Sequence, residues 1–163
     1  MKIVYVDQAY TDYLRQYDNR VSSNIAHTYV RPYIGVLFTV NDLDYFAPLT
    51  TSGKGKKLME NPKQESITFF PIDDCRLGGI NLNNMIPIVD GVYHLFDIDN
   101  EPDRKKKTLL QNQAKVIRKN EKHIISKARK IYRLKTEGKL YPNYDAVTCD
   151  FHLLEEQAKL YNQ

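Results

Sequence analysis

A stretch rich in hydroxyls, glycines and lysines, residues 50–57, carries the side chains best suited to chemistry on a phosphate. Gly53 and Gly55 would let the backbone approach a phosphate closely, while lysines supply charge and hydroxyls donate hydrogen bonds or relay a proton. Such groups can support metal-free RNA cleavage, in which the 2′-hydroxyl attacks the adjacent phosphate and leaves a 2′,3′-cyclic phosphate and a 5′-hydroxyl end. The spacing is not that of a nucleotide-binding P-loop. Composition alone favours a surface loop over an active site.

Three residues upstream could face this stretch. His27, Tyr29 and Arg31 lie just before a predicted strand at residues 33–40, which forms a hairpin with the strand that leads into residue 50. Cationic side chains there could stabilise a phosphate. The four histidines and two cysteines have no metal-ligand spacing, so the sequence predicts neither a metal site nor a cofactor.

Charge is unevenly distributed along the chain. Its net charge is +4 over 163 residues, but residues 104–139 contain 14 of the 24 basic residues and only 2 of the 20 acidic ones. That segment therefore has a net charge of +12, and the rest of the chain −8. Like charges repel along a helix unless a partner compensates them, as a phosphate backbone does with release of counterions. The segment predicts polyanion binding in preference to an ordinary solvated helix surface.

Hydrophobic periodicity predicts strands in the first half of the chain and helices in the second. The strands are expected at residues 2–6, 33–40, 43–49, 67–72, 76–82, 85–89 and 91–97, and residues 18–31 are expected to be irregular. Asn41 and Asp42 predict the hairpin turn. Strands followed by helices indicate an α+β fold: a compact, twisted, mainly antiparallel sheet packed by helices, in one domain over residues 1–163.

Helices are expected over residues 7–17 and from about residue 150. Residues 105–120 and 123–138 are also expected to be helical, either as one helix or as two that meet near Asn120. An apolar residue recurs every seventh position through the basic segment, at Leu110, Ile117, Ile124 and Ile131. This periodicity predicts a stripe that faces the core, with the basic residues on the other faces. Gly138 and Pro142 predict a stop for the helix that precedes them.

The sequence also bounds location and partner. It has no apolar run long enough to span a membrane and no apolar signal region, and its two distant cysteines suit a reduced, cytoplasmic protein. An anionic membrane surface would attract basic helices, but the apolar stripe lacks Trp and Phe and is needed for the core. Some of the tyrosines could stack unpaired bases. No motif that reads a DNA groove is visible, so the hypothesis of a DNA-binding repressor is the weakest of those considered.

Four motifs, in order over nearly the whole chain, resemble the toxins of type III toxin–antitoxin systems, the ToxN/AbiQ family. They are YVRPYIGV at 29–36, YFAPLTTS at 45–52, GINLNNMIPI at 79–88 and FHLLEE at 151–156. The resemblance implies a metal-independent endoribonuclease with a core similar to the Kid/MazF toxin fold, extended by helices. It also implies a small repetitive antitoxin RNA, folded into pseudoknots, that the toxin cuts into inhibitory units. Toxin and RNA would form closed hetero-oligomers, with cellular or phage mRNA as the substrate and abortive infection of phage as the outcome.

The resemblance further implies roles for individual residues. The family's APL-[ST]-S-x-K loop matches residues 47–51 and continues to Lys54. The catalytic hydroxyl would be that of Thr51 or Ser52, and the phosphate-binding lysine would be Lys54, with Lys56 as a substitute. The chain departs from the family at Ser52 and Gly53, with one extra residue where Ser-Pro-Lys is usual. The hydroxyl and the lysine can therefore each shift by a position.

Two residues of the first motif complete the predicted site. Arg31 matches the family's basic residue before the first core strand, and Tyr29 matches an aromatic near the site. The leading hypothesis is thus an endoribonuclease toxin in which Arg31 and Lys54 hold the scissile phosphate. Its alternative is a non-catalytic RNA-binding module that uses the basic helices. The residues predicted to bind RNA are Thr50, Lys56, Lys57, Lys105, Lys106, Lys115, Arg118, Lys119 and Lys122.

Overall fold

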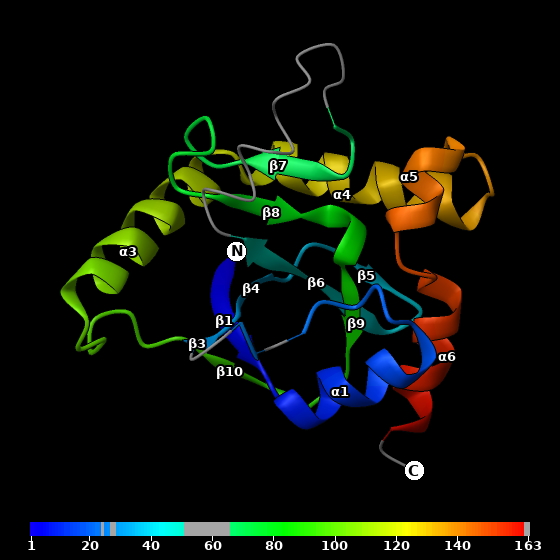
Figure 1. The fold of residues 1–163 in the computed structure, drawn as a ribbon, viewed down its shortest axis with the longest axis horizontal. Helices are drawn as coiled ribbons and strands as arrows, with labels where there is room; N and C mark the ends of the chain where they lie inside the picture. The colour runs from blue at the N-terminus through cyan, green and yellow to red at the C-terminus, as the bar shows by residue number, and fades with distance from the viewer. Residues whose placement is uncertain (24, 27–28, 51–65, 162–163) are drawn as a thin grey trace.

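The computed structural model describes residues 1–23, 25–26, 29–50 and 66–161 of the chain. Most strands precede most helices, and an antiparallel sheet is packed by helices that fill the C-terminal half (Figure 1). The predicted α+β class is therefore confirmed. None of the helices in the described ranges is long and apolar enough to cross a lipid bilayer.

Eight antiparallel strands form the main sheet, in the order β10-β1-β4-β6-β8-β7, with β5 and β9 also paired to β6. Their bounds are β1 Lys2–Val6, β4 Pro32–Gly35, β5 Thr39–Val40, β6 Leu43–Thr50, β7 Phe69–Pro71, β8 Gly79–Asn81, β9 Ile86–Ile88 and β10 Tyr93–Leu95. A 3-10 turn, η1, follows β8 at Leu82–Asn84. β6 is the centre of the sheet because it pairs with four other strands.

The predicted hairpin is present, but its first strand is interrupted. Asn41 and Asp42 both have positive φ, 50° and 62°, as a tight two-residue hairpin turn requires. β4 ends at Gly35, and β5 begins only at Thr39. Leu37 and Phe38 are both buried, whereas neighbours on a regular strand point to opposite faces. The Leu37 N–H donates to the Tyr45 carbonyl, and the Tyr45 N–H donates to the Phe38 carbonyl, which holds this irregular stretch against β6.

The predicted helices are all present. They are α1 Gln8–Tyr17, α3 Arg104–Lys119, α4 Glu121–Thr136 and α6 Phe151–Leu160. The carboxylate of Asp103 accepts hydrogen bonds from two backbone N–H groups of α3, and that of Asp150 accepts one from α6. The predicted stripe of one leucine and three isoleucines is buried, which confirms that α3 and α4 turn their apolar faces to the core.

Two features of the fold were not predicted. Pro142 follows the end of α4, as predicted, and is also the first residue of a further helix, α5 Pro142–Val147. At that position a backbone N–H has no partner within the helix, so its absence in proline does not weaken α5. The stretch predicted to be irregular contains a two-stranded ribbon, β2 Ile25–Ala26 and β3 Tyr29–Val30. Two-residue strands are too short to show an alternating pattern.

The helices cover the sheet on different sides. α6 packs against β9, α1 and α4. In Figure 1, α4 runs behind β7 and β8, and the Lys127 ammonium donates to the Phe69 carbonyl 2.8 Å away, which ties α4 to β7. The basic helix α4 thus lies against the strand that follows residues 51–65.

Candidate functional site

The candidate site is centred on the point where β6 ends. Thr50 is the last residue of β6, is 5% exposed, and stands opposite Gly79 of β8. A side chain on Gly79 would collide with the ring of Phe69, so the strands pack closely here. After residue 65 the chain returns in β7, which pairs with the other edge of β8. Both flanks of residues 51–65 are therefore fixed to one strand.

Several predicted site residues fall in this segment. Thr51, Ser52, Lys54, Lys56 and Lys57 lie outside the described residues. What the structure gives is their point of attachment, the buried end of the central strand. Thr50, predicted to bind RNA, is buried at that point.

Arg31, another of the predicted site residues, contacts the end of β6. Its Nη1 donates to the carbonyl of Leu49 at 3.2 Å, two residues before Thr51. Its Nε donates to the carbonyl of Ser23 at 3.0 Å. Tyr29 belongs to β3, and its side chain, like all of His27, lies outside the described part of the structure. The structure thus brings Arg31 to the end of β6.

The segment that accepts the Nε bond of Arg31 is itself held by a buried carboxylate. Asp18 is 4% exposed and follows α1 directly. Its Oδ1 accepts from the backbone N of Arg20 at 2.9 Å and from the Arg20 Nε at 2.8 Å. Its Oδ2 accepts from the backbone N of Asp150 at 2.7 Å, which joins the end of α1 to the start of α6. This cluster was not predicted, because Asp18 and Asp150 are 132 residues apart.

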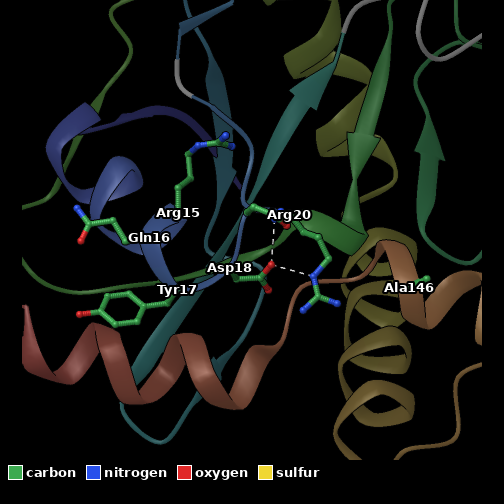
Figure 2. Close-up of a pocket in the computed structure, with 7 residues that line it drawn as sticks. Arg15, Gln16, Tyr17, Asp18, Arg20 and Ala146 are labelled. Carbon is green, nitrogen blue, oxygen red and sulfur yellow. Dashed lines mark hydrogen bonds and ion pairs between the residues drawn. The ribbon is translucent and has the colours of Figure 1, made fainter.

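A polar pocket lies beside Asp18 (Figure 2). It is lined by Arg15, Gln16, Tyr17, Asp18, Asn19, Arg20 and Ala146. Both arginines are already engaged within the chain: Arg20 pairs with Asp18, and Arg15 donates to the carbonyl of Val21. Figure 2 shows the Asp18–Arg20 contacts at the centre of this corner. The cluster therefore acts as a support for residues 18–23.

Asp18 makes stability depend on pH. Burial would raise the pKa of its carboxyl, but hydrogen bonds from Arg20 and from the Asp150 N–H outweigh burial and lower the pKa below the usual value. Because the pKa is lower in the folded state, the ionised carboxylate stabilises the fold above the unfolded pKa. That contribution is lost as the pH falls through the folded pKa.

We predict that Asp18→Asn lowers the free energy of unfolding at pH 7 by about 2–3 kcal/mol, the usual worth of charged hydrogen bonds. The difference from wild type should shrink as the pH falls below about 4. Urea denaturation from pH 7 to pH 3 measures both effects. Asp12→Asn, an exposed carboxylate on α1, is the matched control. A difference for Asp18→Asn that stays constant across this pH range would contradict the assignment.

The basic segment contains two kinds of cation. Some are used within the chain: Lys106 pairs with Glu101 at 2.8 Å and lies over the ring of Phe96, and Lys135 pairs with Asp145 at 2.8 Å. A second set of cations is exposed, and among the described residues their side-chain nitrogens make no ion pair and no hydrogen bond. This set is Lys105, Lys115, Arg118, Lys119, Lys122, Arg129, Lys130 and Arg133.

The two acidic residues of the segment leave these exposed cations uncompensated. Glu121 pairs with the amino group of Met1 at 2.9 Å, and Glu137 pairs with Lys139 at 2.8 Å. We call the exposed cations at the junction of α3 and α4, Lys115, Arg118, Lys119 and Lys122, the junction patch. It contains four of the six basic-segment residues predicted to bind RNA, whereas Lys106 is tied to Glu101.

Comparison with solved structures identifies the class of protein. The fold matches a protein of a bacterial antiviral system regulated by a processed non-coding RNA, with 30% identity, a TM-score of 0.85 and 100% of each chain covered. It also matches a type III toxin–antitoxin structure in which a non-coding RNA pseudoknot selectively inhibits the toxin, with 29% identity, a TM-score of 0.81, and 99% and 98% of the two chains covered. The fold is that of type III toxins.

Comparison of sequences then gives the family. Residues 2–159 match the family described as toxin ToxN of type III toxin–antitoxin systems. Endoribonuclease ToxN of Pectobacterium atrosepticum is 34% identical over 96% of this chain and 91% of its own length. Endoribonuclease AbiQ of Lactococcus lactis subsp. lactis is 30% identical over 97% of this chain and 87% of its own length. The chain therefore belongs to the ToxN/AbiQ family of type III toxins and is an endoribonuclease.

Proposed function

We propose that this chain is a toxin that cuts cellular or phage mRNA and is held inactive by a small repetitive RNA folded into pseudoknots. The observation that carries the proposal is the attachment of the hydroxyl–lysine segment to the buried end of β6, beside Arg31. Structural relatives in which a non-coding RNA inhibits the toxin, or regulates an antiviral system, support the partner and the role in phage defence. The toxin would act as one domain, in the cytoplasm, in closed assemblies with its RNA.

The proposed chemistry is a transesterification without a metal. The 2′-oxygen of the RNA bonds to the adjacent phosphorus as the bond to the 5′-oxygen breaks, which leaves a 2′,3′-cyclic phosphate and a 5′-hydroxyl. Lys54, or Lys56 in its place, and Arg31 stabilise the charge that develops on the phosphate oxygens. The hydroxyl of Thr51 or Ser52 donates a hydrogen bond to the phosphate or relays a proton, and Tyr29 lies near the reacting group.

Cleavage in the presence of EDTA tests this proposal. Purified protein incubated with a long single-stranded RNA and excess EDTA should cut it, because lysine and arginine supply the positive charge that a metal would otherwise provide. Tight binding of RNA that stays intact would instead indicate a binding module. Activity that EDTA removes and Mg²⁺ restores would contradict the metal-free mechanism.

The junction patch is the surface we propose for the backbone of the antitoxin RNA. Four exposed cations at one helix junction, with no ion pair to another described residue, suit a phosphate backbone, which would release counterions on binding. The patch includes Lys122 of α4, and α4 is tied to β7, the strand that follows the proposed catalytic segment. An RNA bound there would lie close to the site that it inhibits.

We predict that reversing three of these charges, in Lys115→Glu, Arg118→Glu and Lys122→Glu combined, weakens inhibition by the antitoxin RNA at least tenfold at moderate salt. The slope of log affinity against log salt should become shallower by about 2–3, near one unit for each lost phosphate contact. Cleavage of a short RNA should persist. Lys2, Arg76 and Lys159, which are exposed and lie outside α3 and α4, give a control triple with the same change in charge. Equal loss in both triples would contradict the patch.

A further inference from the structure

We infer that Arg31 positions the catalytic segment by bridging residues 18–23 to the end of β6, in addition to any charge that it offers the phosphate. The inference rests on the proposed function, since it concerns the same reaction. It assigns Arg31 a task that lysine, with the same charge, cannot perform.

The geometry of the guanidinium is the first argument. The Arg31 Nε donates to the Ser23 carbonyl, 8 residues before it, and Nη1 donates to the Leu49 carbonyl, 18 residues after it. A planar guanidinium presents its N–H groups in a fixed fork, so it holds two acceptors at a set separation. A lysine ammonium is a single point charge on a flexible stem and can hold neither that angle nor that separation.

The register of the sheet explains why the Leu49 carbonyl needs this donor. β4 pairs with β6 through Tyr33 opposite Pro48 and Ile34 opposite Ala47. The next pair in this register would place Pro32 opposite Leu49, and proline has no N–H to donate. The side chain of Arg31, one residue earlier, donates to Leu49 instead. The Arg31 side chain therefore replaces the backbone hydrogen bond that Pro32 cannot donate to Leu49, at the end of the β4–β6 pairing and just before the proposed catalytic residues.

The other end of the bridge is firm. The backbone of residues 18–23 is fixed by Asp18, by Arg15 on the Val21 carbonyl, and by the Tyr33 hydroxyl, which donates to the Ser22 carbonyl at 3.4 Å. Asp18 in turn is bonded to the backbone N of Asp150, at the start of α6. Arg31 thus links β6 to a part of the molecule held by α1 and α6. The Asp18–Arg20 contacts shown in Figure 2 hold the segment whose Ser23 carbonyl accepts from Arg31.

Loss of the bridge should misplace the reacting groups. On its β8 side the end of β6 stays paired, through Leu49 with Ile80 and Thr50 with Gly79. On its β4 side the Arg31 contact holds the Leu49 carbonyl, one residue before the end of the strand. A shift of about 1 Å in a reacting group can reduce the rate about 10²-fold.

Kinetics of Arg31→Lys and Arg31→Ala test the inference. Arg31→Lys should lose kcat by about 10²-fold with KM changed less than about threefold, because Lys keeps the charge and loses the bridge. Arg31→Ala should lose at least as much kcat, because it loses both. Arg76→Lys, at an exposed arginine, is the control and should stay near wild type. Hydrogen exchange at the amides of Thr50 and Ile80 should accelerate in both Arg31 variants. Wild-type kcat in Arg31→Lys, or unchanged exchange in Arg31→Ala, would overturn the positioning role.

Chemical rescue keeps the test decisive if Arg31→Lys folds poorly. Guanidinium added at millimolar concentration should restore kcat to Arg31→Ala, whereas methylammonium should not. Equal rescue by both cations would show that charge alone matters and would overturn the inference. If wild type itself fails to cut RNA in EDTA, the proposed mechanism fails, and that result is distinct from active wild type with an active Arg31→Lys.

Discussion

Replacing Lys54 with Ala is expected to reduce RNA cleavage about 10²–10³-fold, the usual cost of removing a group that stabilises a developing oxyanion. Lys54 is the cation nearest in sequence to the proposed catalytic hydroxyls, and no metal shares its task in the proposed mechanism. Single-turnover cleavage of an end-labelled RNA measures the effect, and growth of cells that express the variant provides a second readout. The variant should not be toxic.

Matched variants locate the lysine. Lys56→Ala should lose less than Lys54→Ala if the assignment holds, and Lys159→Ala, on the exposed side of α6, should behave as wild type. A Lys54→Ala protein that remains toxic and active would remove Lys54 from the site. A larger loss in Lys56→Ala would shift the phosphate-binding role by two positions.

Replacing Glu155 with Ala should produce the largest loss of stability, about 3 kcal/mol or more, because it leaves the buried hydroxyl of Tyr45 and the half-buried hydroxyl of Tyr132 without an acceptor. Glu155 is 4% exposed, and its Oε1 accepts from the hydroxyls of Tyr45 at 2.8 Å and Tyr132 at 2.6 Å. Its Oε2 accepts from the Asn41 amide at 3.2 Å. One carboxylate therefore ties α6 to α4, to the hairpin turn and to β6.

The neighbouring glutamate is a close control for this prediction. Glu156 is exposed on the same helix, so Glu156→Ala should change the free energy of unfolding by less than about 0.5 kcal/mol. Burial, and after it the negative charge of Glu155, raise the pKa of Tyr45, so its hydroxyl stays a donor over the physiological range. Urea denaturation at pH 7 compares the two variants. Equal stability of Glu155→Ala and Glu156→Ala would contradict the role of Glu155.

Features that repeat along the chain could be predicted from sequence, whereas single long-range contacts could not. The stripe from Leu110 to Ile131 predicted helical structure, as one helix or two, because it repeats every seven residues. Asn41 with Asp42 predicted a tight turn through their tolerance of positive φ. α5 was missed because Pro142 is compatible both with a stop and with a first helical turn.

The candidate site shows the same division. The motif around residues 47–52 and the basic residue before β4 predicted Arg31 at the site, and the structure places it at the end of β6. The motif could not predict that the Arg31 guanidinium donates two hydrogen bonds to backbone carbonyls. The bond to Leu49 depends on the register of Pro32 against Leu49 in the folded sheet. Composition likewise predicted that Lys106 binds RNA with the other cations. In the structure its ammonium pairs with Glu101 and lies over the ring of Phe96.

The most direct test of the proposed mechanism uses an RNA with a single 2′-deoxy substitution. Once a cut site has been mapped with wild-type protein in EDTA, the same RNA is made with deoxyribose at the nucleotide whose 2′-hydroxyl would attack. We predict that the all-ribose RNA yields a 2′,3′-cyclic phosphate and a 5′-hydroxyl end, and that the substituted RNA stays intact at that position. Cleavage of the substituted RNA at the same bond, or a 5′-phosphate on the product, would contradict the mechanism proposed for residues 51–54 and Arg31.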